Sequence, residues 1–246
     1  NVQVIGQSAF SPCYGLTSLK LPGSVREIGE FAFSCCSFLT EIVLPEGGLE
    51  IGRSAFSMCK KLEKIVVPEG TEKLGRGIFL GCSGLREAVL PATLKEVENS
   101  VFSGCDRLER ISVNPDNIYL KDVDGVLYSK DEKNLLLFPG GRLEIVIPEG
   151  VKEIGKEAFS GNRHLDRLKL PESLEVIGES AFYRCTELNR LEFPGALKEI
   201  RESAFSGCTG LEMVVFPEKT ELIGDSVFRG CRNLLWMNVP ENLAFN

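Results

Sequence analysis

Residues 16–39 read LTSLKLPGSVREIGEFAFSCCSFL, and this stretch decides the fold because its pattern recurs along the chain. The recurrence is clearest in one phenylalanine, which returns at every 23rd position in two series. The interval between the two series, from Phe102 to Phe159, exceeds one repeat by 34 positions, so a single insertion interrupts nine copies of the repeat. The nine residues are Phe10, Phe33, Phe56, Phe79, Phe102, Phe159, Phe182, Phe205 and Phe228.

Other positions keep the same phase. A cysteine follows the phenylalanine by three positions in eight copies, and Asn162 takes its place in the sixth copy. A leucine follows three positions later, and an apolar-x-apolar-Pro phrase such as Leu19-Lys20-Leu21-Pro22 comes next. An Ile-Gly pair precedes most of the phenylalanines, but Glu98 and Arg201 replace its glycine, so a left-handed backbone is not required there.

A repeat unit this short cannot enclose a core of its own, whereas stacked units bury a continuous column of equivalent side chains. The alternation before each proline predicts a short parallel strand, which the proline ends because it has no N–H group. The Ala-Phe-x-x-Cys stretch predicts a helical or 3-10 turn, and Val25–Gly29 predicts a second short strand. We therefore expect an α/β leucine-rich-repeat solenoid of about nine 23-residue turns, with a parallel β-sheet and one β-hairpin insertion.

The phrase Leu-x-x-Leu-x-Leu-Pro-x-x-(Val/Leu)-x-x-Ile-Gly-x-x-Ala-Phe-x-x-Cys-x-x-Leu resembles the BspA-like leucine-rich repeat family. The resemblance covers nearly the whole chain. It implies a bacterial or protist protein at the cell surface or secreted, which adheres to proteins or glycans of a host or a neighbouring cell. It carries no catalytic residue set and guarantees no shared ligand, because function belongs to sites rather than folds.

We expect a single solenoid over residues 1–246, with a first repeat block at 1–113, a hairpin insertion at 114–148 and a second block at 149–246. Asn114 stands where other copies have proline, and Pro115-Asp116-Asn117 is rich in turn formers. Two β-rich runs, 126–128 and 135–138, flank a polar stretch at 129–134 and predict the hairpin. It either projects as a functional loop or packs on the solenoid, and similar hairpins in the resembled family favour packing.

Composition excludes several classes of protein. The 246 residues hold 43% hydrophobic and 26% charged residues, which is ordinary globular usage, and the longest apolar runs are too short to span a membrane. The net charge of −7, without a basic cluster, argues against nucleic acid as a partner. One histidine leaves little material for a metal site, and we expect no metal, no cofactor and no enzymatic activity.

The nine cysteines permit three interpretations: buried free thiols, disulfides or a metal site. Eight recur at one phase, which is typical of a buried column, and equivalent stacked side chains point in the same direction rather than at each other. Free thiols are therefore favoured, and they fit a reducing or anaerobic setting. Cys35 and Cys36 form the only close pair, and their redox state stays open.

Two further motifs are interpreted as structural. His164 is expected to be exposed and without a catalytic role. The stretch Asp122-x-Asp124-Gly125 lacks the further ligands of a calcium loop, so a hairpin turn is the better interpretation.

The exposed strand face is the candidate binding surface, because the residues between the buried leucines and isoleucines point outward. Alternating charges there could pair across strands, and three valines form a stripe beside them. Near the C-terminus, Met213 and Val215 could join Trp236, which is either an interface anchor or a cover for the last turn. The candidate residues are Glu41, Val43, Lys64, Val66, Glu87, Val89, Arg110, Arg167, Arg190, Met213 and Trp236.

Two functions remain open from the sequence. The first is a non-enzymatic binding module that recognises a protein or glycan through this face. The second is a structural spacer or assembly unit of a longer repeat protein, without a specific ligand. The sequence starts and stops within a repeat and shows no signal-like leader, so we expect a segment of a longer array or end-to-end self-association, with no insertion into a membrane.

Overall fold

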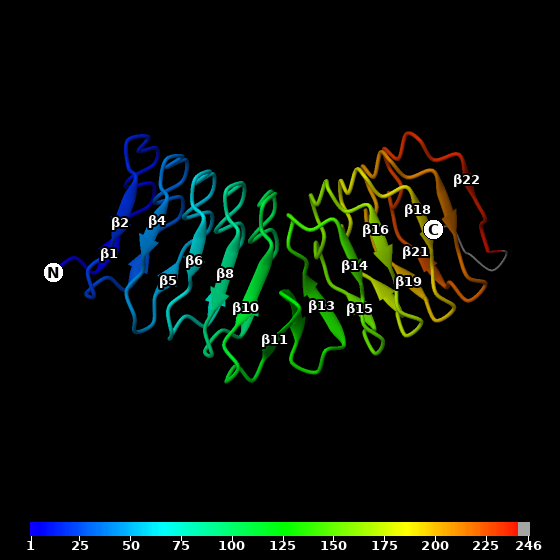
Figure 1. Cartoon of the computed structure of the whole chain (residues 1–246), viewed down its shortest axis with the longest axis horizontal. Helices are drawn as coiled ribbons and strands as arrows, with labels where there is room; N and C mark the ends of the chain where they lie inside the picture. Colours follow the sequence, from blue (N-terminus) through cyan, green and yellow to red (C-terminus); the bar gives the residue numbers. More distant parts are fainter. Residues whose placement is uncertain (241–246) are drawn as a thin grey trace. The chain divides into compact units, whose positions relative to one another are not determined.

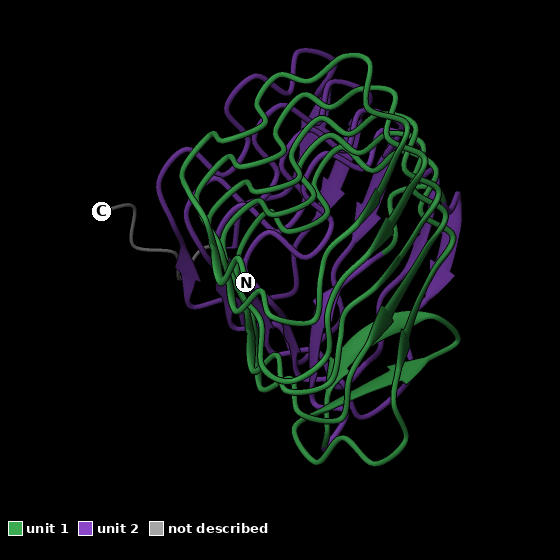
Figure 2. Cartoon of the chain, turned by 90° about the vertical axis from the view of Figure 1, so that its left-hand side faces the viewer, with its two compact units in different colours: residues 1–130, 139–141 green, residues 131–138, 142–246 purple. Residues whose placement is uncertain are grey.

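A computed structural model describes residues 1–240 and divides the chain into two compact units. Unit 1 comprises residues 1–130 and 139–141, and unit 2 comprises residues 131–138 and 142–246 (Figure 2). Each unit is a stack of coils, and each complete coil carries two short strands (Figure 1). The strand before the proline is here called the major strand, and the strand that ends at the isoleucine of the Ile-Gly pair is called the minor strand.

The strands of unit 1 follow the phase of the repeat. Parallel pairs join equivalent residues of consecutive copies, as in Ser18 with Glu41 and Lys64 with Glu87. The major strands are β2 (Ser18–Lys20), β4 (Glu41–Val43), β6 (Lys64–Val66), β8 (Glu87–Leu90) and β10 (Arg110–Val113). The minor strands are β1 (Val4–Ile5), β3 (Glu27–Ile28), β5 (Glu50–Ile51), β7 (Lys73–Leu74) and β9 (Glu96–Val97). These minor strands confirm the second short strand that the sequence predicts.

Unit 2 repeats the same architecture. Its major strands are β14 (Glu144–Val146), β16 (Arg167–Lys169), β18 (Arg190–Glu192), β20 (Met213–Val215) and β22 (Trp236–Met237). Its minor strands are β13 (Asn134–Leu137), β15 (Glu153–Ile154), β17 (Val176–Ile177), β19 (Glu199–Ile200) and β21 (Leu222–Ile223). The leucine-rich-repeat solenoid is therefore confirmed.

The expected helical or 3-10 turns are wrong, because residues 1–240 contain no helix and the coils consist of strands and turns. The residue two before each repeat phenylalanine mostly has a positive φ, as in Ser54 (54°), and so does the residue two after many of them, as in Met58 (61°). A helix cannot contain such residues at this spacing. The amides between them alternate: Ser57 donates to Ser54 within the coil, whereas Phe56 donates to the next coil at Ile78 (3.0 Å).

A stacked column of phenylalanines forms the core of each unit. In unit 1, Phe33, Phe56 and Phe79 are fully buried, with ring centroids 5.4 and 5.8 Å apart. The planes are within 11° of parallel because each ring occupies the same place in its coil. Buried aromatic rings contribute large apolar area, so this column holds consecutive coils together.

The insertion supplies the first coil of unit 2, which the sequence analysis did not foresee. Leu135 in β13 pairs in parallel with Ile154, as the isoleucine of a regular minor strand would. Phe138 then stacks on Phe159 at 4.7 Å and donates its amide to Ala158 at 2.8 Å. Phe138 thus stands where a regular coil has its repeat phenylalanine.

The remainder of the insertion is anchored to unit 1. The structure adds a strand, β11 (Leu120–Val123), which pairs antiparallel with β12 (Val126–Ser129) around the turn at Asp124–Gly125. Asn117 is fully buried and donates its Nδ2 group to the backbone oxygens of Pro91 (2.9 Å) and Leu94 (2.8 Å). These bonds fix the start of the insertion to the preceding coil.

Candidate functional site

The major strands present two rows of outward side chains. In β4 and β6 the middle residues, Ile42 and Ile65, are buried, and the residues on either side are exposed. Most of the predicted face is exposed, and the rest of it is half-buried. The exposed residues are Glu41, Val43, Lys64, Val66, Arg110, Arg167, Arg190 and Trp236, and the half-buried ones are Glu87, Val89 and Met213.

Glu87 is the centre of an ion triad on the face of unit 1. Its carboxylate lies 2.8 Å from Lys64 Nζ and accepts hydrogen bonds from Arg110 Nη2 (2.6 Å) and Nε (3.1 Å). The hydrogen bond from Lys64, followed by that from Arg110, lowers the pKa of Glu87. The parallel register places one charge on each of three adjacent strands, which confirms the expected cross-strand pairing.

An apolar stripe runs beside this triad. Val43 and Val66 expose 43% and 51% of their surface, and Val66 is paired with Val89 on the next strand. The stripe is thus one residue wide and is bordered by a row of fixed charges. Such a border allows an apolar contact and a charged contact to be made at the same time.

The hairpin of β11 and β12 covers the free edge of β10. Gly125 accepts a hydrogen bond from the Ile111 amide (2.9 Å), and Asp122 Oδ1 accepts one from the Val113 amide (2.8 Å). A side chain at Gly125, where φ is 75°, would place its Cβ 2.7 Å from that of Arg110. Asp122 is therefore engaged by backbone, as a hairpin turn requires, and the hairpin closes the last strand of unit 1.

Two residues of the face in unit 2 were missed by the sequence analysis. Val146 in β14 is 68% exposed, and Glu144 in the same strand lies 3.0 Å from Arg167 Nη1. The signal was present, since residues 143–148 return to the repeat phase, but they had been assigned to the insertion.

An open depression of about 530 Å³ lies on this face of unit 2. It spans the coils of β14, β16 and β18, and most of its polar lining is basic. The lining consists of Arg142, Glu144, Ile145, Val146, Asp166, Arg167, Leu168, Lys169 and Arg190. Four of these side chains carry positive charge and two carry negative charge, although the whole chain has a net charge of −7.

The last strands bring the predicted apolar residues together. Met213 pairs with Trp236 in the register of β20 and β22, and Trp236 is 51% exposed. Leu235 beside it is 83% exposed. An indole at the edge of a sheet offers a large apolar contact with little loss of conformational entropy on binding.

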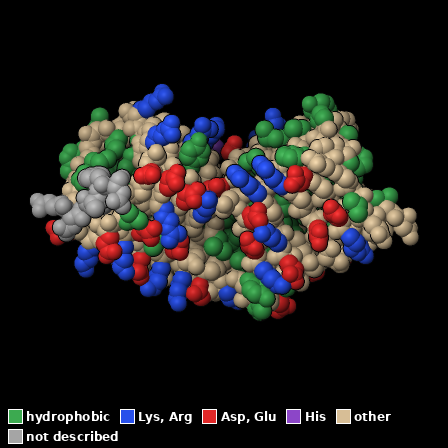
Figure 3. Space-filling view, turned by 180° about the vertical axis from the view of Figure 1, so that it is seen from behind, with side chains coloured by type: hydrophobic (Ala, Val, Ile, Leu, Met, Phe, Trp, Pro, Cys, Tyr) green, Lys and Arg blue, Asp and Glu red, His purple; other side chains and the backbone are tan. Residues whose placement is uncertain are grey.

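Charged residues that precede the minor strands of unit 2 are paired from coil to coil. Glu175 lies 2.7 Å from both Lys152 Nζ and Lys198 Nζ, one coil to either side. Hydrogen bonds from Lys152, then from Lys198, lower the pKa of Glu175 to about 2. The space-filling view from behind shows basic and acidic side chains interspersed over the face that it presents (Figure 3).

All nine cysteines are free thiols, and six of them are buried. From Cys36 onward each Sγ–H group donates to the backbone oxygen of the phenylalanine one coil earlier, as Cys59 does to Phe33 at 3.3 Å. The column therefore has a structural role. Within residues 1–240 no three His, Cys, Asp or Glu side chains are grouped to hold a metal ion, and His164 is exposed.

Three features define a leucine-rich-repeat solenoid: coils that keep one repeat phase, parallel strands that end at a proline, and an apolar column. The comparison with family models is specific. Residues 1–122 and 142–245 match the BspA type leucine rich repeat region in six copies, and the chain belongs to this family.

Solved structures share the fold. A leucine-rich repeat protein from Eubacterium ventriosum is 22% identical, with a TM-score of 0.73 over 94% of this chain. This chain spans 62% of that protein. A leucine rich cell surface protein from Faecalibacterium prausnitzii is 24% identical, with a TM-score of 0.61 over 100% of this chain and 84% of its own length. The pneumococcal vaccine antigen PcpA is 24% identical, with a TM-score of 0.68 over 95% of this chain and 72% of its own length.

No curated protein matches the chain. Among residues 1–240, no helix meets the length and hydropathy needed to cross a bilayer.

Proposed function

We propose that this chain is a non-enzymatic binding module of a secreted or cell-surface protein, which recognises proteins or glycans through the major strand face. The observation that carries the proposal is the exposed stripe of Val43 and Val66 beside the triad centred on Glu87. Apolar side chains exposed in a row lose hydration favourably when a partner covers them. The neighbouring charges are held by one another and would fix the register of that partner.

Membership of the BspA type family supports a binding or structural role, since leucine-rich repeat families are generally non-enzymatic. The F. prausnitzii relative in fold is described as a cell surface protein, which supports display outside the cell. The reduced thiols fit an anaerobic or reducing setting, and six of the nine are buried away from oxidants.

The second candidate function is a spacer that displays other parts of a longer protein. The observation that favours it is the pairing of charges from coil to coil beside the minor strands of unit 2, which stabilises the stack itself. The two functions differ in whether a ligand binds saturably.

The test is a binding screen of the purified chain against immobilised extracellular-matrix proteins and glycans. The variant Lys64→Glu, Val66→Asp, Arg110→Glu disrupts the face of unit 1. The matched control, Glu27→Lys with Glu50→Lys, changes exposed charges on the minor strands instead. Circular dichroism verifies that both variants fold.

We expect saturable binding that the triple variant loses and the control retains. Binding that persists in the triple variant and disappears in the control would place the site on the minor strands and contradict the proposal. Absence of any saturable ligand, with the chain folded, would establish the spacer in its place.

A further inference from the structure

The basic depression on unit 2 differs chemically from the corresponding face of unit 1. Lys169 in β16 occupies the position that Val43, Val66 and Val89 occupy in their strands. In unit 1 three consecutive strands have a valine at this position after Lys20, whereas in unit 2 Lys169 follows Val146 and precedes Glu192. The continuous apolar stripe of unit 1 is thus interrupted by charge in unit 2.

Neighbouring groups hold the arginines of the depression in place. Arg167 lies 3.0 Å from Glu144 and 3.5 Å from Asp166, and Arg190 is paired with Glu192. A guanidinium group has five N–H donors, so each arginine keeps donors beyond those used in its ion pair. Because these side chains are already fixed, less conformational entropy is lost when an anion binds to them.

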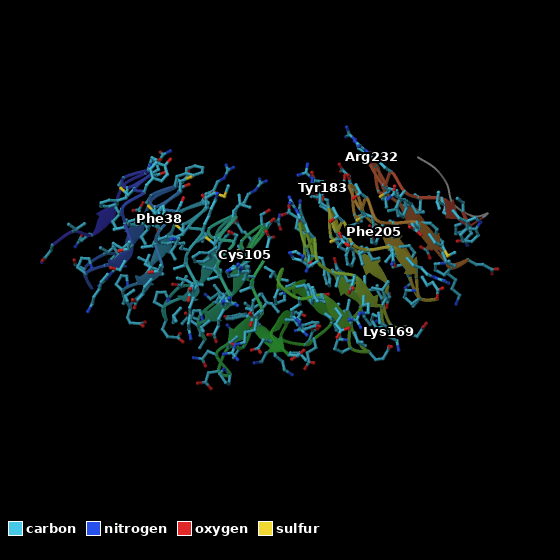
Figure 4. The ribbon with its side chains drawn as sticks, turned by 45° about the horizontal axis from the view of Figure 1, so that its top comes forward. Phe38, Cys105, Lys169, Tyr183, Phe205 and Arg232 are labelled. Atoms are coloured by element: carbon cyan, nitrogen blue, oxygen red, sulfur yellow. The ribbon has the colours of Figure 1, made fainter. Side chains whose placement is uncertain are left out.

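Lys169 is the cation with the greatest freedom to accept a ligand. It is exposed, and among the described residues it makes no ion pair. Its side chain extends from the face rather than into the core (Figure 4). An ammonium group without a partner gains more from a bound anion than one already paired does, because no existing ion pair has to be broken.

The depression is open, and its lining also includes apolar side chains. Two of them are Val146, which is 68% exposed, and the half-buried Leu168. Neither offers the enclosed pocket in which a protein partner anchors an aromatic side chain. Exposed apolar surface beside cations suits the C–H face of a sugar ring whose acidic group reaches those cations.

We propose that this depression binds an acidic polysaccharide, with Lys169, Arg190 and Arg167 contacting its carboxylate or sulfate groups. The inference rests on the proposed binding function and assigns a ligand class to the major strand face of unit 2. Arg167 and Lys169 lie on β16 and Arg190 lies on β18, so these cations come from two consecutive coils. A linear polymer with several acidic groups can contact cations on both coils, whereas a compact anion would engage only some of them.

The experiment is isothermal titration calorimetry of the full chain with a heparin dodecasaccharide and with a polygalacturonate oligomer, which carry sulfate and carboxylate groups respectively. Polyglutamate and single-stranded DNA serve as polyanions without sugar acids. Lys169→Glu tests the site, and Lys20→Glu is its matched control because Lys20 occupies the same strand position in unit 1.

We expect saturable binding of at least one acidic oligosaccharide, reduced about tenfold or more by Lys169→Glu and less than about twofold by Lys20→Glu. The logarithm of the affinity should fall linearly with the logarithm of salt concentration, since a polyanion releases counterions on binding. Arg190→Glu should weaken binding in the same direction.

Three results would overturn the inference: no binding of either oligosaccharide at low salt, equal loss in the two lysine variants, or tighter binding of polyglutamate or DNA. The matrix screen separates this failure from failure of the proposed function. If the matrix screen finds a ligand that the unit 1 triple variant loses, the proposed binding function stands even when calorimetry refutes the polysaccharide site.

Discussion

The thiol of Cys105 donates a hydrogen bond to the backbone oxygen of Phe79, one coil earlier, at a distance of 3.2 Å. Both residues are buried, so this oxygen has no access to water. The repeat places a thiol over the phenylalanine oxygen of the preceding coil from Cys36 to Cys105 and again from Cys185 to Cys231. Figure 4 labels one member of this set, Cys105.

Replacing Cys105 with alanine should lower the free energy of unfolding by about 1–1.5 kcal/mol, because the buried Phe79 oxygen loses one of its two hydrogen bonds and keeps the one from the Cys82 amide (3.1 Å). Cys13→Ala is the control, since Cys13 is only half-buried and belongs to the first described coil. We expect the control to cost less than about 1 kcal/mol. Urea denaturation measures both, and equal losses would contradict the role assigned to the thiol column.

Phe56→Ala should lower the free energy of unfolding by about 3–5 kcal/mol, because it leaves a cavity between Phe33 and Phe79. Phe10 is 44% exposed and stacks on one ring only, so Phe10→Ala should cost clearly less. Lys64→Ala, on the exposed face, should cost less than about 1 kcal/mol. A loss at Phe56 no larger than the loss at Phe10 would argue against a continuous phenylalanine core.

Two glycines at the same repeat position should respond oppositely to alanine. A Cβ at Gly52 would lie 2.7 Å from the backbone nitrogen of Glu30, whereas at Gly75 the nearest atom would lie at an ordinary 3.6 Å. Neither has a positive φ, so Gly75→Ala should be neutral or stabilise by about 0.4–1 kcal/mol through the unfolded state. Gly52→Ala should destabilise. Thermal denaturation of the pair tests the difference, which similar melting temperatures would refute.

Glu175 should make stability depend on acid pH. Its folded-state pKa of about 2 lies below the value of about 4.3 for an unfolded glutamate, so its stabilising contribution is complete above about pH 5. The contribution is lost as the pH falls from there toward 2. Glu175→Gln should therefore be less stable than the parent at pH 7 and equal to it near pH 2.

Urea denaturation between pH 2 and 7 measures this dependence. Glu63→Gln is the control, because Glu63 is exposed and has no ion pair among the described residues. A constant difference between Glu175→Gln and the parent across this range would show that the ion pairs with Lys152 and Lys198 do not contribute to folding.

The candidate site was predictable as far as the repeat phase extends. Lys64, Glu87 and Arg110 were placed on one row by counting, and the structure pairs them. Glu144 and Val146 were missed because the boundary of the insertion was drawn after them. The depression could not be foreseen, since it depends on side chains from three coils and on the ion pairs that orient them.

The sequence by itself determined the repeat, the solenoid, the phenylalanine column and the two outward rows. Each depends on periodicity, and stacking equivalent coils places residues of the same phase beside one another. Tertiary structure decided what lacks that periodicity. It replaced the expected helical turns with left-handed residues, because each coil also bonds to the next through its backbone. It also drew Phe138 into the second column, because a buried ring stabilises the start of unit 2 whatever its spacing in the chain.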